Sequence, residues 1–292
     1  MAISSKVSQL MNISRQIEMM SNPIFLALTE GTYNSVVTFN TVYAADIDNG
    51  VGSSDEILTD GTQTIAFPPH GSNATVVKIS SNNANDTSDG TGARTLYVEG
   101  LDENYNKINE TITMNGQTAV LTTNKFSRIN RLVVQTSGTN TELTIGKFGD
   151  TCAPNIGTIY CGDGVVTDGV PATIYSTVQP LKGWSRQAVM SIPTGYFPIL
   201  LNPASICGAN KLVEFKIYFR FGYEGCWIET FSWQNFQQMG NLNFSVGGIY
   251  YVPGDVMVVA SGATSPAAMI LAEFIMIRND LLAELQAELG AL

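Results

Sequence analysis

The sequence predicts an all-β protein with two β-sandwich domains, jelly-roll-like in character, and a short amphipathic helix at each end of the chain. Hydrophobic residues make up 44% of its 292 residues and charged residues only 14%. That balance is typical of strands whose exposed faces carry uncharged polar side chains. Short alternating or β-branched runs recur at intervals of roughly 8 to 12 residues, as they do in sandwiches. A chain of this length suits two domains of ordinary size.

The first segment, residues 1–22, has the apolar spacing of an amphipathic helix. Its apolar side chains recur at intervals of seven, three, four and three residues, and Pro23 ends the pattern. A helix of about four turns cannot hold its fold by propensity alone, so it must bury its apolar stripe. We expect it to do so against another chain. The stripe consists of Ile3, Leu10, Ile13, Ile17 and Met20.

Residues 23–150 are predicted to form the first sandwich. Strand-like runs such as "ATVVKISS" and "RTLYVEGL" flank a loop dense in Asn, Asp and Gly. These side chains hydrogen-bond their own backbone in Asx-turns, so a self-satisfied loop explains the stretch without a ligand. Asp102 in "LDENYNKI" predicts a hairpin loop. Arg94 and Glu99 are expected to pair across strands.

The Gly- and Asp-rich residues 151–182 are predicted to be a linker, and residues 183–278 a second, jelly-roll-like sandwich. In this second domain "YVPGDVMVVASG" has the Pro-Gly turn that returns a late strand across a sandwich. The clearest strand, "KLVEFKIYFRF", alternates, so that one face is core and the other is wet or contacts a partner. The core face consists of Val213, Phe215, Ile217, Phe219 and Phe221.

The last segment, residues 279–292, predicts a second short amphipathic helix, which Asn279 or Asp280 can cap. Two helices at opposite ends of a β chain, each too small to be stable alone, indicate contacts for assembly. We therefore expect both helices at an assembly interface. The apolar face of the second consists of Leu282, Leu285 and Leu289.

Charge and hydropathy exclude several classes of partner. The formal net charge of −10 opposes binding to nucleic acid, because phosphate contacts need Lys and Arg. No apolar run reaches the roughly 18 residues of a membrane span, and the N-terminal segment lacks the features of a secretory signal. We expect no membrane partner and assembly in a cytoplasm. The four cysteines are expected to be reduced and mostly buried, with a Cys152–Cys161 bridge left open.

The sequence carries little catalytic chemistry, and we expect neither an enzyme nor a cofactor. The single histidine, His70 in "FPPHGS", lies in a predicted turn, where a triad or zinc site is improbable. "DIDNGVGSSDE" fails the calcium-loop spacing, because Gly falls fifth rather than sixth. Exposed loop acids are the favoured interpretation, and a cation site at Asp46, Asp48, Asp55 and Glu56 is a weak alternative. A glycoside hydrolase stays open, since the separation of two carboxylates is a spatial quantity.

The stretch "NANDTSDGTGARTLYVEGLDENYNKINETITMNGQTAV" resembles a module of virion structural proteins of tailed bacteriophages, particularly marine ones. "MSIPTGYFPILLN", "LVEFKIYFRF" and "YVPGDVMVVASG" extend the resemblance through the second half. The most specific part is Gly90 to Asp102. The resemblance implies a non-enzymatic particle component with β-sandwich domains, located in the virion.

Two hypotheses of function follow. The leading one is a capsid decoration or cement protein on the phage head, bound as a homo-oligomer, expected to be a trimer, with the major capsid protein or other virion proteins as partners. The alternative is a tail or fibre component that recognises a host surface glycan through exposed aromatic and acidic side chains. Its candidate contacts are Trp227, Glu229, Trp233 and Tyr251.

Overall fold

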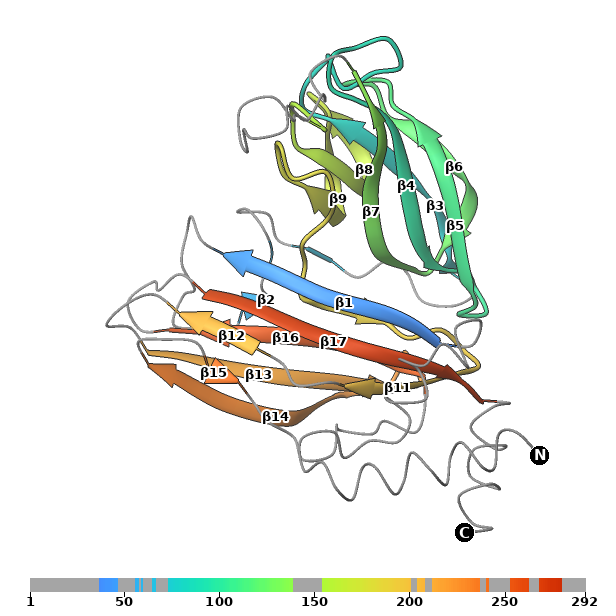
Figure 1. The fold of residues 1–292 in the computed structure, drawn as a ribbon. Coiled ribbons are helices and arrows are strands. Elements are labelled where there is room, and N and C mark those ends of the chain that lie inside the picture. The colour runs from blue at the N-terminus through green and yellow to red at the C-terminus, as the bar shows by residue number, and fades with distance from the viewer. Residues whose placement is uncertain are drawn as a thin grey trace, which may run out of the picture.

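The computed structural model describes residues 37–46, 56–57, 59, 65–66, 73–138, 154–200, 204–207, 212–236, 240–241, 253–262 and 268–279. Within these ranges the chain forms seventeen strands in four antiparallel sheets (Figure 1). The all-β prediction is confirmed for this part of the chain. The predicted helices of residues 1–22 and 279–292, with both apolar stripes, lie outside it except for Asn279. None of the described residues forms a helix long and apolar enough to cross a lipid bilayer.

The base sandwich, the lower body in Figure 1, is built from strands at both ends of the described chain. β1 pairs with β17 over ten residues, from Val37 opposite Ile277 to Asp46 opposite Ala268. One sheet holds β1 (Val37–Asp46), β17 (Ala268–Arg278), β12 (Ala204–Cys207), β15 (Gly240–Asn241) and β11 (Tyr196–Leu200). The other holds β10 (Val189–Ser191), β16 (Gly254–Ser261), β13 (Leu212–Phe221), β14 (Trp227–Phe236) and β2 (Glu56–Ile57).

The two sheets of the base sandwich share one hydrophobic core. The alternation predicted in β13 is confirmed for Val213, Phe215, Ile217 and Phe219, which are fully buried, whereas Phe221 at the strand end is 40% exposed. Cys207, Ala268, Ile270 and Met276 of the opposite sheet pack into the same cluster. The jelly-roll order of connections stays a prediction.

The inserted sandwich, the upper body in Figure 1, has the same two-layered organisation. Its core draws on both sheets and includes Ile79, Leu96, Phe126, Leu132 and Ile159. One sheet has the order β6 (Val120–Phe126), β3 (Thr75–Ser81), β8 (Ile159–Thr167), β9 (Val170–Val178). The other has the order β5 (Lys107–Thr113), β4 (Ala93–Leu101), β7 (Arg128–Ser137).

The domain boundaries in the structure differ from the predicted 23–150, 151–182 and 183–278. β1 and β2 belong to the base sandwich through β17 and β16, so the upper sandwich is inserted between β2 and β10. The predicted linker contains β8 and β9, which complete a sheet of the inserted sandwich. Its Gly and Asp residues mark a hairpin instead, since Asp168 and Gly169 have φ angles of 50° and 79° between Thr167 and Val170. Two successive positive φ angles are typical of the type I′ turn.

Candidate functional site

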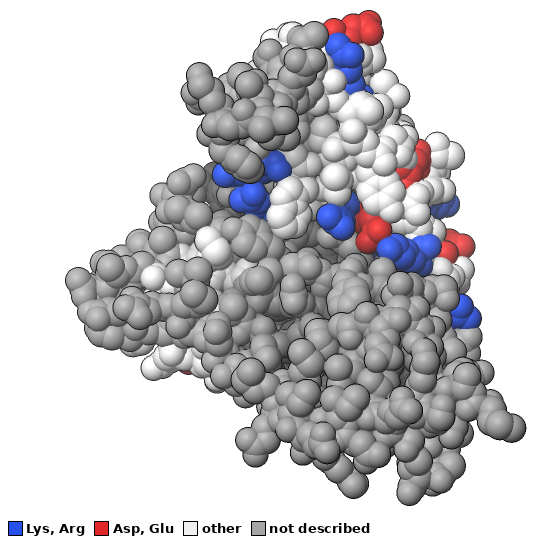
Figure 2. All heavy atoms as spheres, viewed as in Figure 1, with Lys and Arg blue, Asp and Glu red and all other residues white. Residues whose placement is uncertain are grey.

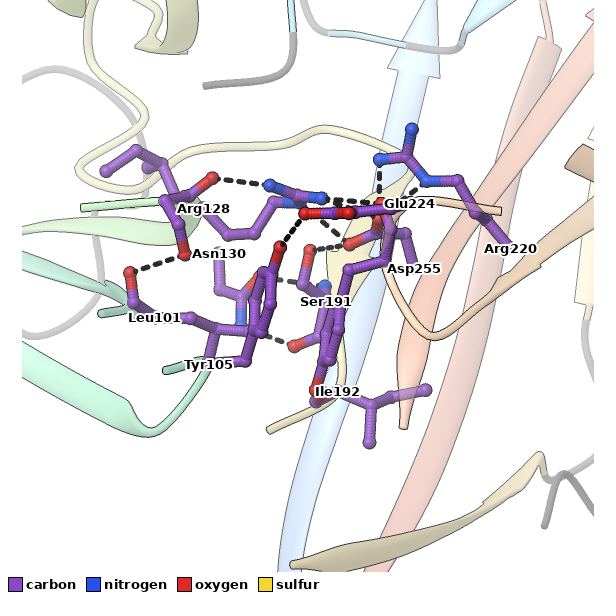
Figure 3. Close-up of polar contacts among 12 residues, drawn as sticks. Leu101, Tyr105, Arg128, Asn130, Ser191, Ile192, Arg220, Glu224 and Asp255 are labelled. Atoms are coloured by element: carbon purple, nitrogen blue, oxygen red, sulfur yellow. Dashed lines mark hydrogen bonds and ion pairs between the residues drawn. The ribbon is translucent and has the colours of Figure 1, made fainter. Parts of the chain in front are cut away.

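The two sandwiches meet at a buried cluster of charged and aromatic residues, which we call the joint (Figure 3). Asp255 of β16 lies between Arg128 of β7, in the inserted sandwich, and Arg220 of β13, in the base sandwich. Arg128 Nε and Nη2 donate to the two carboxylate oxygens at 2.9 and 3.0 Å. Arg220 Nε and Nη2 donate to Oδ2 at 2.8 and 2.5 Å. One buried carboxylate therefore links the two domains.

The strands bring these side chains together through close backbone approaches. Asp255 and Arg220 are register partners on neighbouring strands. A Cβ atom at Gly254 would lie 2.1 Å from the carbonyl oxygen of Arg220, and one at Gly100 would lie 2.0 Å from that of Arg128. A side chain at either position would push the arginine backbone away. Glycine at these two places allows the approach that both ion pairs need.

The carboxylate of Asp255 is saturated with donors. Besides the four guanidinium hydrogen bonds, Ser191 Oγ donates to Oδ1 at 2.5 Å. A carboxylate offers about four lone-pair sites, so these five donors occupy its hydrogen-bonding capacity. The side chains of Asp255 and Arg128 are 0% and 1% exposed, and that of Arg220 is 10% exposed. This arrangement is a mechanical link rather than a reactive group.

Uncharged groups add a second link beside the carboxylate. Asn130 of β7 donates from Nδ2 to the carbonyl oxygen of Ser191 at 2.7 Å and accepts from the Ser191 N–H at 2.8 Å. Arg128 Nη2 also donates to the carbonyl oxygen of Tyr223, at 3.0 Å. Thr194 donates from its backbone N–H to the Tyr105 carbonyl oxygen at 2.9 Å. Backbone and side chains of both domains are therefore interlocked.

Two tyrosines from opposite hairpins close the joint. Tyr105, between β4 and β5, and Tyr223, between β13 and β14, stack with ring centroids 3.7 Å apart and planes 5° apart. Both have left-handed backbone angles, φ 60° and 66°, which cost a non-glycine residue about 1–2 kcal/mol each. Burial raises the pKa of both hydroxyls. Tyr223 donates its hydroxyl to the Ile192 carbonyl oxygen, and Tyr105 to Glu224. The strained turns thus present rings that meet across the domain boundary.

The predicted Asn- and Asp-rich loop folds around a second buried carboxylate. Asp86 is 0% exposed and accepts from Ser81 Oγ at 2.6 Å and from the backbone N–H groups of Ala93, Ile156 and Gly157 at 2.8 to 2.9 Å. It ties the loop to the segment before β8. The Asx-turn prediction is confirmed at Asn83, which accepts from the Asn85 N–H at 2.9 Å. This loop needs no ligand to hold its shape.

Other polar predictions in the inserted sandwich have mixed outcomes. Asp102 accepts from the N–H groups of Asn104 and Asn106, both at 2.8 Å, which confirms the hairpin loop. Glu99 pairs across strands with Lys107, with 2.9 Å between Oε2 and Nζ. Arg94 does not pair across strands in this way; its Nε donates to the carbonyl oxygen of Gly90 at 3.1 Å.

The structure separates the candidate glycan contacts. β14 carries an irregularity between Glu229, opposite Tyr218, and Phe231, opposite Ile217, so residues before and after it face opposite sides of the sheet. Trp227 lies beside the Arg220 guanidinium, 4.6 Å from ring centroid to Cζ. Trp233 instead stacks on core Phe215 and donates to Ser205 Oγ at 2.8 Å. The three described candidates do not gather on one surface.

The remaining candidates are described only in part. Tyr251, Asp48, Asp55, His70 and the assembly stripes lie outside the described residues, and of Asp46 only the backbone, at the end of β1, is described. In the described ranges no group of three or more His, Cys, Asp or Glu side chains is placed to hold a metal ion. Cys161 and Cys207 are buried free thiols, and Cys226 is exposed.

Sequence reasoning missed the joint. Arg128 and Asp255 are 127 residues apart, and nothing in either strand indicates the other. The available signal was weak: Arg220 and Asp255 are charged residues within apolar strands, and such residues are paired when buried.

Comparisons with known proteins add no family. No protein-family model and no curated protein match the sequence. A structure of infectious bursal disease virus, Gx strain, is 8% identical with a TM-score of 0.19, and the match covers 83% of this chain and 71% of that chain. A lipoprotein from Bacteroides thetaiotaomicron is 8% identical with a TM-score of 0.16, covering 80% of this chain and 99% of that chain. At these TM-scores neither similarity carries an argument.

Proposed function

We propose that this protein is a non-enzymatic structural component of a virion, a decoration or cement protein bound as a homo-oligomer to the head of a tailed bacteriophage. The observation that supports this best is the joint. Interfaces between domains of one chain are ordinarily polar and permit relative motion. Here a buried carboxylate, two guanidinium groups and a tyrosine stack hold the sandwiches together. A particle component that repeats the same contacts at many positions benefits from such a fixed shape.

The path of the chain indicates which of the two sandwiches faces the capsid shell. Val37, at the start of β1, pairs with Ile277, next to the last residue of β17. β1 therefore begins, and β17 ends, at the same end of one sheet of the base sandwich. Both assembly helices are predicted in the sequence before β1 and after β17. We assign the attachment and oligomer contacts to the base sandwich, with the inserted sandwich projecting away from the shell.

The alternative glycan site in the base sandwich has less support. Trp233 lies against the core, so Trp233→Ala would weaken folding as well as any sugar contact. Trp227 is engaged with Arg220 at the joint. No observation on β14 favours this candidate over the assembly proposal.

The proposal is tested by mass and by location. Multi-angle light scattering should give three times the 31.4 kDa chain mass for the trimer, and the mass should fall to one chain after deletion of residues 1–21. Antibody labelling of separated heads and tails should mark heads. A full-length monomer at micromolar concentration, or labelling confined to tails, would overturn the proposal.

A further inference from the structure

An exposed apolar patch lies at one end of the base sandwich, on the hairpin that joins β13 to β14. Phe221, the last residue of β13, is 40% exposed, and Ile228, near the start of β14, is 49% exposed. Ile228 is the register partner of the core residue Phe219, and the rings of Phe219 and Phe221 lie 4.7 Å apart. The hydrophobic core therefore continues to the surface at this hairpin. We call Phe221, Ile228 and the exposed Cys226, between them in sequence, the hairpin patch.

The hairpin patch lies beside the end of β17. Two hydrogen bonds to the short link between β10 and β11 establish this. Tyr223, in the turn of the hairpin, donates its hydroxyl to the Ile192 carbonyl oxygen, and the Asn279 N–H donates to the Gly195 carbonyl oxygen at 2.9 Å. Because β1 begins where β17 ends, the patch lies at the end of the base sandwich that both strands share (Figure 1).

The two large apolar side chains of the hairpin patch are exposed together. The other exposed large hydrophobic residues of the described chain are dispersed over β6, β8, the segment after β9 and the far end of β13; they are Leu121, Val165, Leu181 and Leu212. Figure 2 shows basic side chains on either side of acidic ones, low on the inserted sandwich, so charge alone selects no partner there. Apolar side chains that are exposed side by side indicate a protein contact more strongly than isolated ones do.

The predicted N-terminal helix, residues 1–22, matches the hairpin patch in both hydropathy and charge. Lys6 falls three residues after Ile3 and four before Leu10, so it lies within the apolar stripe. A cation inside an apolar stripe is best matched by a carboxylate on the receiving surface. The exposed Glu224 supplies one, because it lies in the turn of the hairpin. The patch thus offers an apolar surface and an acid, and the helix an apolar stripe and a base.

The predicted C-terminal helix, residues 279–292, fits the hairpin patch less well. It carries Asp280, Glu284 and Glu288 but no Lys or Arg. Like charges brought together in an interface oppose binding, and Glu224 would face these acids. Charge complementarity therefore selects the N-terminal helix as the occupant.

We propose that the hairpin patch binds the N-terminal helix of a second copy of this chain, with the stripe on Phe221 and Ile228 and with Lys6 beside Glu224. Within one chain both apolar side chains stay exposed, which leaves the patch open for another copy. Residues 23–36 can extend to roughly 45–50 Å at about 3.3–3.6 Å per residue, enough to reach a neighbour. Repeated from copy to copy, such a head-to-tail contact can close a ring. This inference rests on the proposed function and names the surface that joins the oligomer.

Analytical ultracentrifugation of the full chain over a concentration series measures the contribution of the patch. Ile228→Ser should raise the concentration at which the oligomer dissociates about tenfold or more, because the stripe loses an apolar contact. The matched control is Leu212→Ser, at the far end of β13, where the leucine is 50% exposed. It should change that concentration less than about twofold. Equal effects of the two substitutions would overturn the proposal.

Charge reversal tests the pairing of Lys6 with Glu224. Lys6→Glu and Glu224→Lys should each weaken association, and the double variant should recover most of the loss. Glu224 also accepts from the Tyr105 hydroxyl at 3.3 Å (Figure 3), and this bond is lost in the double variant as well, so recovery reports the contact between copies. Thermal melts identify any variant that fails to fold. A folded double variant that associates no better than the weaker single variant overturns the pairing.

The exposed thiol of Cys226 reports the neighbouring copy directly. Chains that carry Ser14→Cys and Cys226→Ser are mixed with isotope-labelled wild type and oxidised mildly. On a regular helix Ser14 flanks the stripe, whereas Ser8 lies on the opposite side. Mass spectrometry should find the labelled Cys226 bonded to the thiol introduced at Ser14, and little of this product with Ser8→Cys. No such disulfide, or an equal amount from both positions, overturns the proposal.

The outcomes separate this inference from the proposed function. A full chain that stays monomeric overturns both. An oligomer that dissociates after deletion of residues 1–21 but keeps its affinity in Ile228→Ser overturns the role of the hairpin patch alone.

Discussion

Replacement of Asp255 by Asn should destabilise the protein more than any exposed charge change. The substitution keeps the shape of the side chain but leaves Arg128 and Arg220, 1% and 10% exposed, facing each other without a counter-charge. Removing one partner of a buried ion pair costs about 3–5 kcal/mol. For a chain of this size each kcal/mol lowers the melting temperature by about 2–4 °C, so the expected loss is about 6–20 °C.

Scanning calorimetry measures this loss and also tests whether the joint couples the domains. Wild type should melt in a single transition, whereas Arg128→Met, which removes the link from the inserted sandwich, should separate the melting of the two sandwiches. Asp163→Asn is the control, because its 3.7 Å pair with Lys78 is partly exposed and contributes less than about 1 kcal/mol. The reasoning is refuted if Asp255→Asn melts as the control does, or if wild type already shows two transitions.

Three further predictions concern other buried groups. Asp86→Ala should destabilise the inserted sandwich by about 3 kcal/mol or more, because three backbone N–H groups lose their acceptor. The control Asp89→Ala changes an exposed residue and should not have this effect. An equal loss of unfolding free energy in both variants, measured by urea titration, would contradict the prediction. Burial raises the pKa of the Tyr223 hydroxyl, so the neutral hydroxyl contributes stability that is fully present below the ordinary tyrosine pKa of about 10 and is lost as the pH rises above that value. Above about pH 10 the melting temperature of Tyr223→Phe should therefore fall less steeply with pH than that of wild type. Parallel curves of melting temperature against pH would count against this prediction. Among Cys161, Cys207 and Cys226, only the exposed Cys226 should react quickly with a thiol reagent in the native protein, since Cys161 and Cys207 are buried and burial raises the pKa of the Cys161 thiol. Mass spectrometry measures the rate at which each thiol is modified. Rapid modification of all three thiols would argue against the described packing.

Local rules predicted much of the fold. The alternation in β13 predicted its core face because side chains on a strand have a period of two. Asp102 and Asn83 predicted turns because their side chains bond backbone groups only a few residues away. These predictions depend on neighbours in sequence, and the structure confirms them.

Predictions that depend on distant pairing failed or could not be made. The membership of β1 in the base sandwich requires a partner strand more than two hundred residues later, as Val37 opposite Ile277 shows. Trp227 and Trp233 have the spacing of one strand face, but the irregularity at Thr230 turns them to opposite sides. Arg128 and Asp255 meet only because one sandwich is inserted in the other. Such contacts are set by topology, which periodicity alone does not contain.

Electron cryo-microscopy of purified virions tests the proposed role most directly. We predict density for this chain on the outer head surface at positions of threefold symmetry, with the base sandwich against the capsid shell. The inserted sandwich should project outward at one fixed angle in every copy, because the joint holds it. Density for the chain only in the tail, or an inserted sandwich that packs against the shell or varies in angle between copies, would contradict the proposed function.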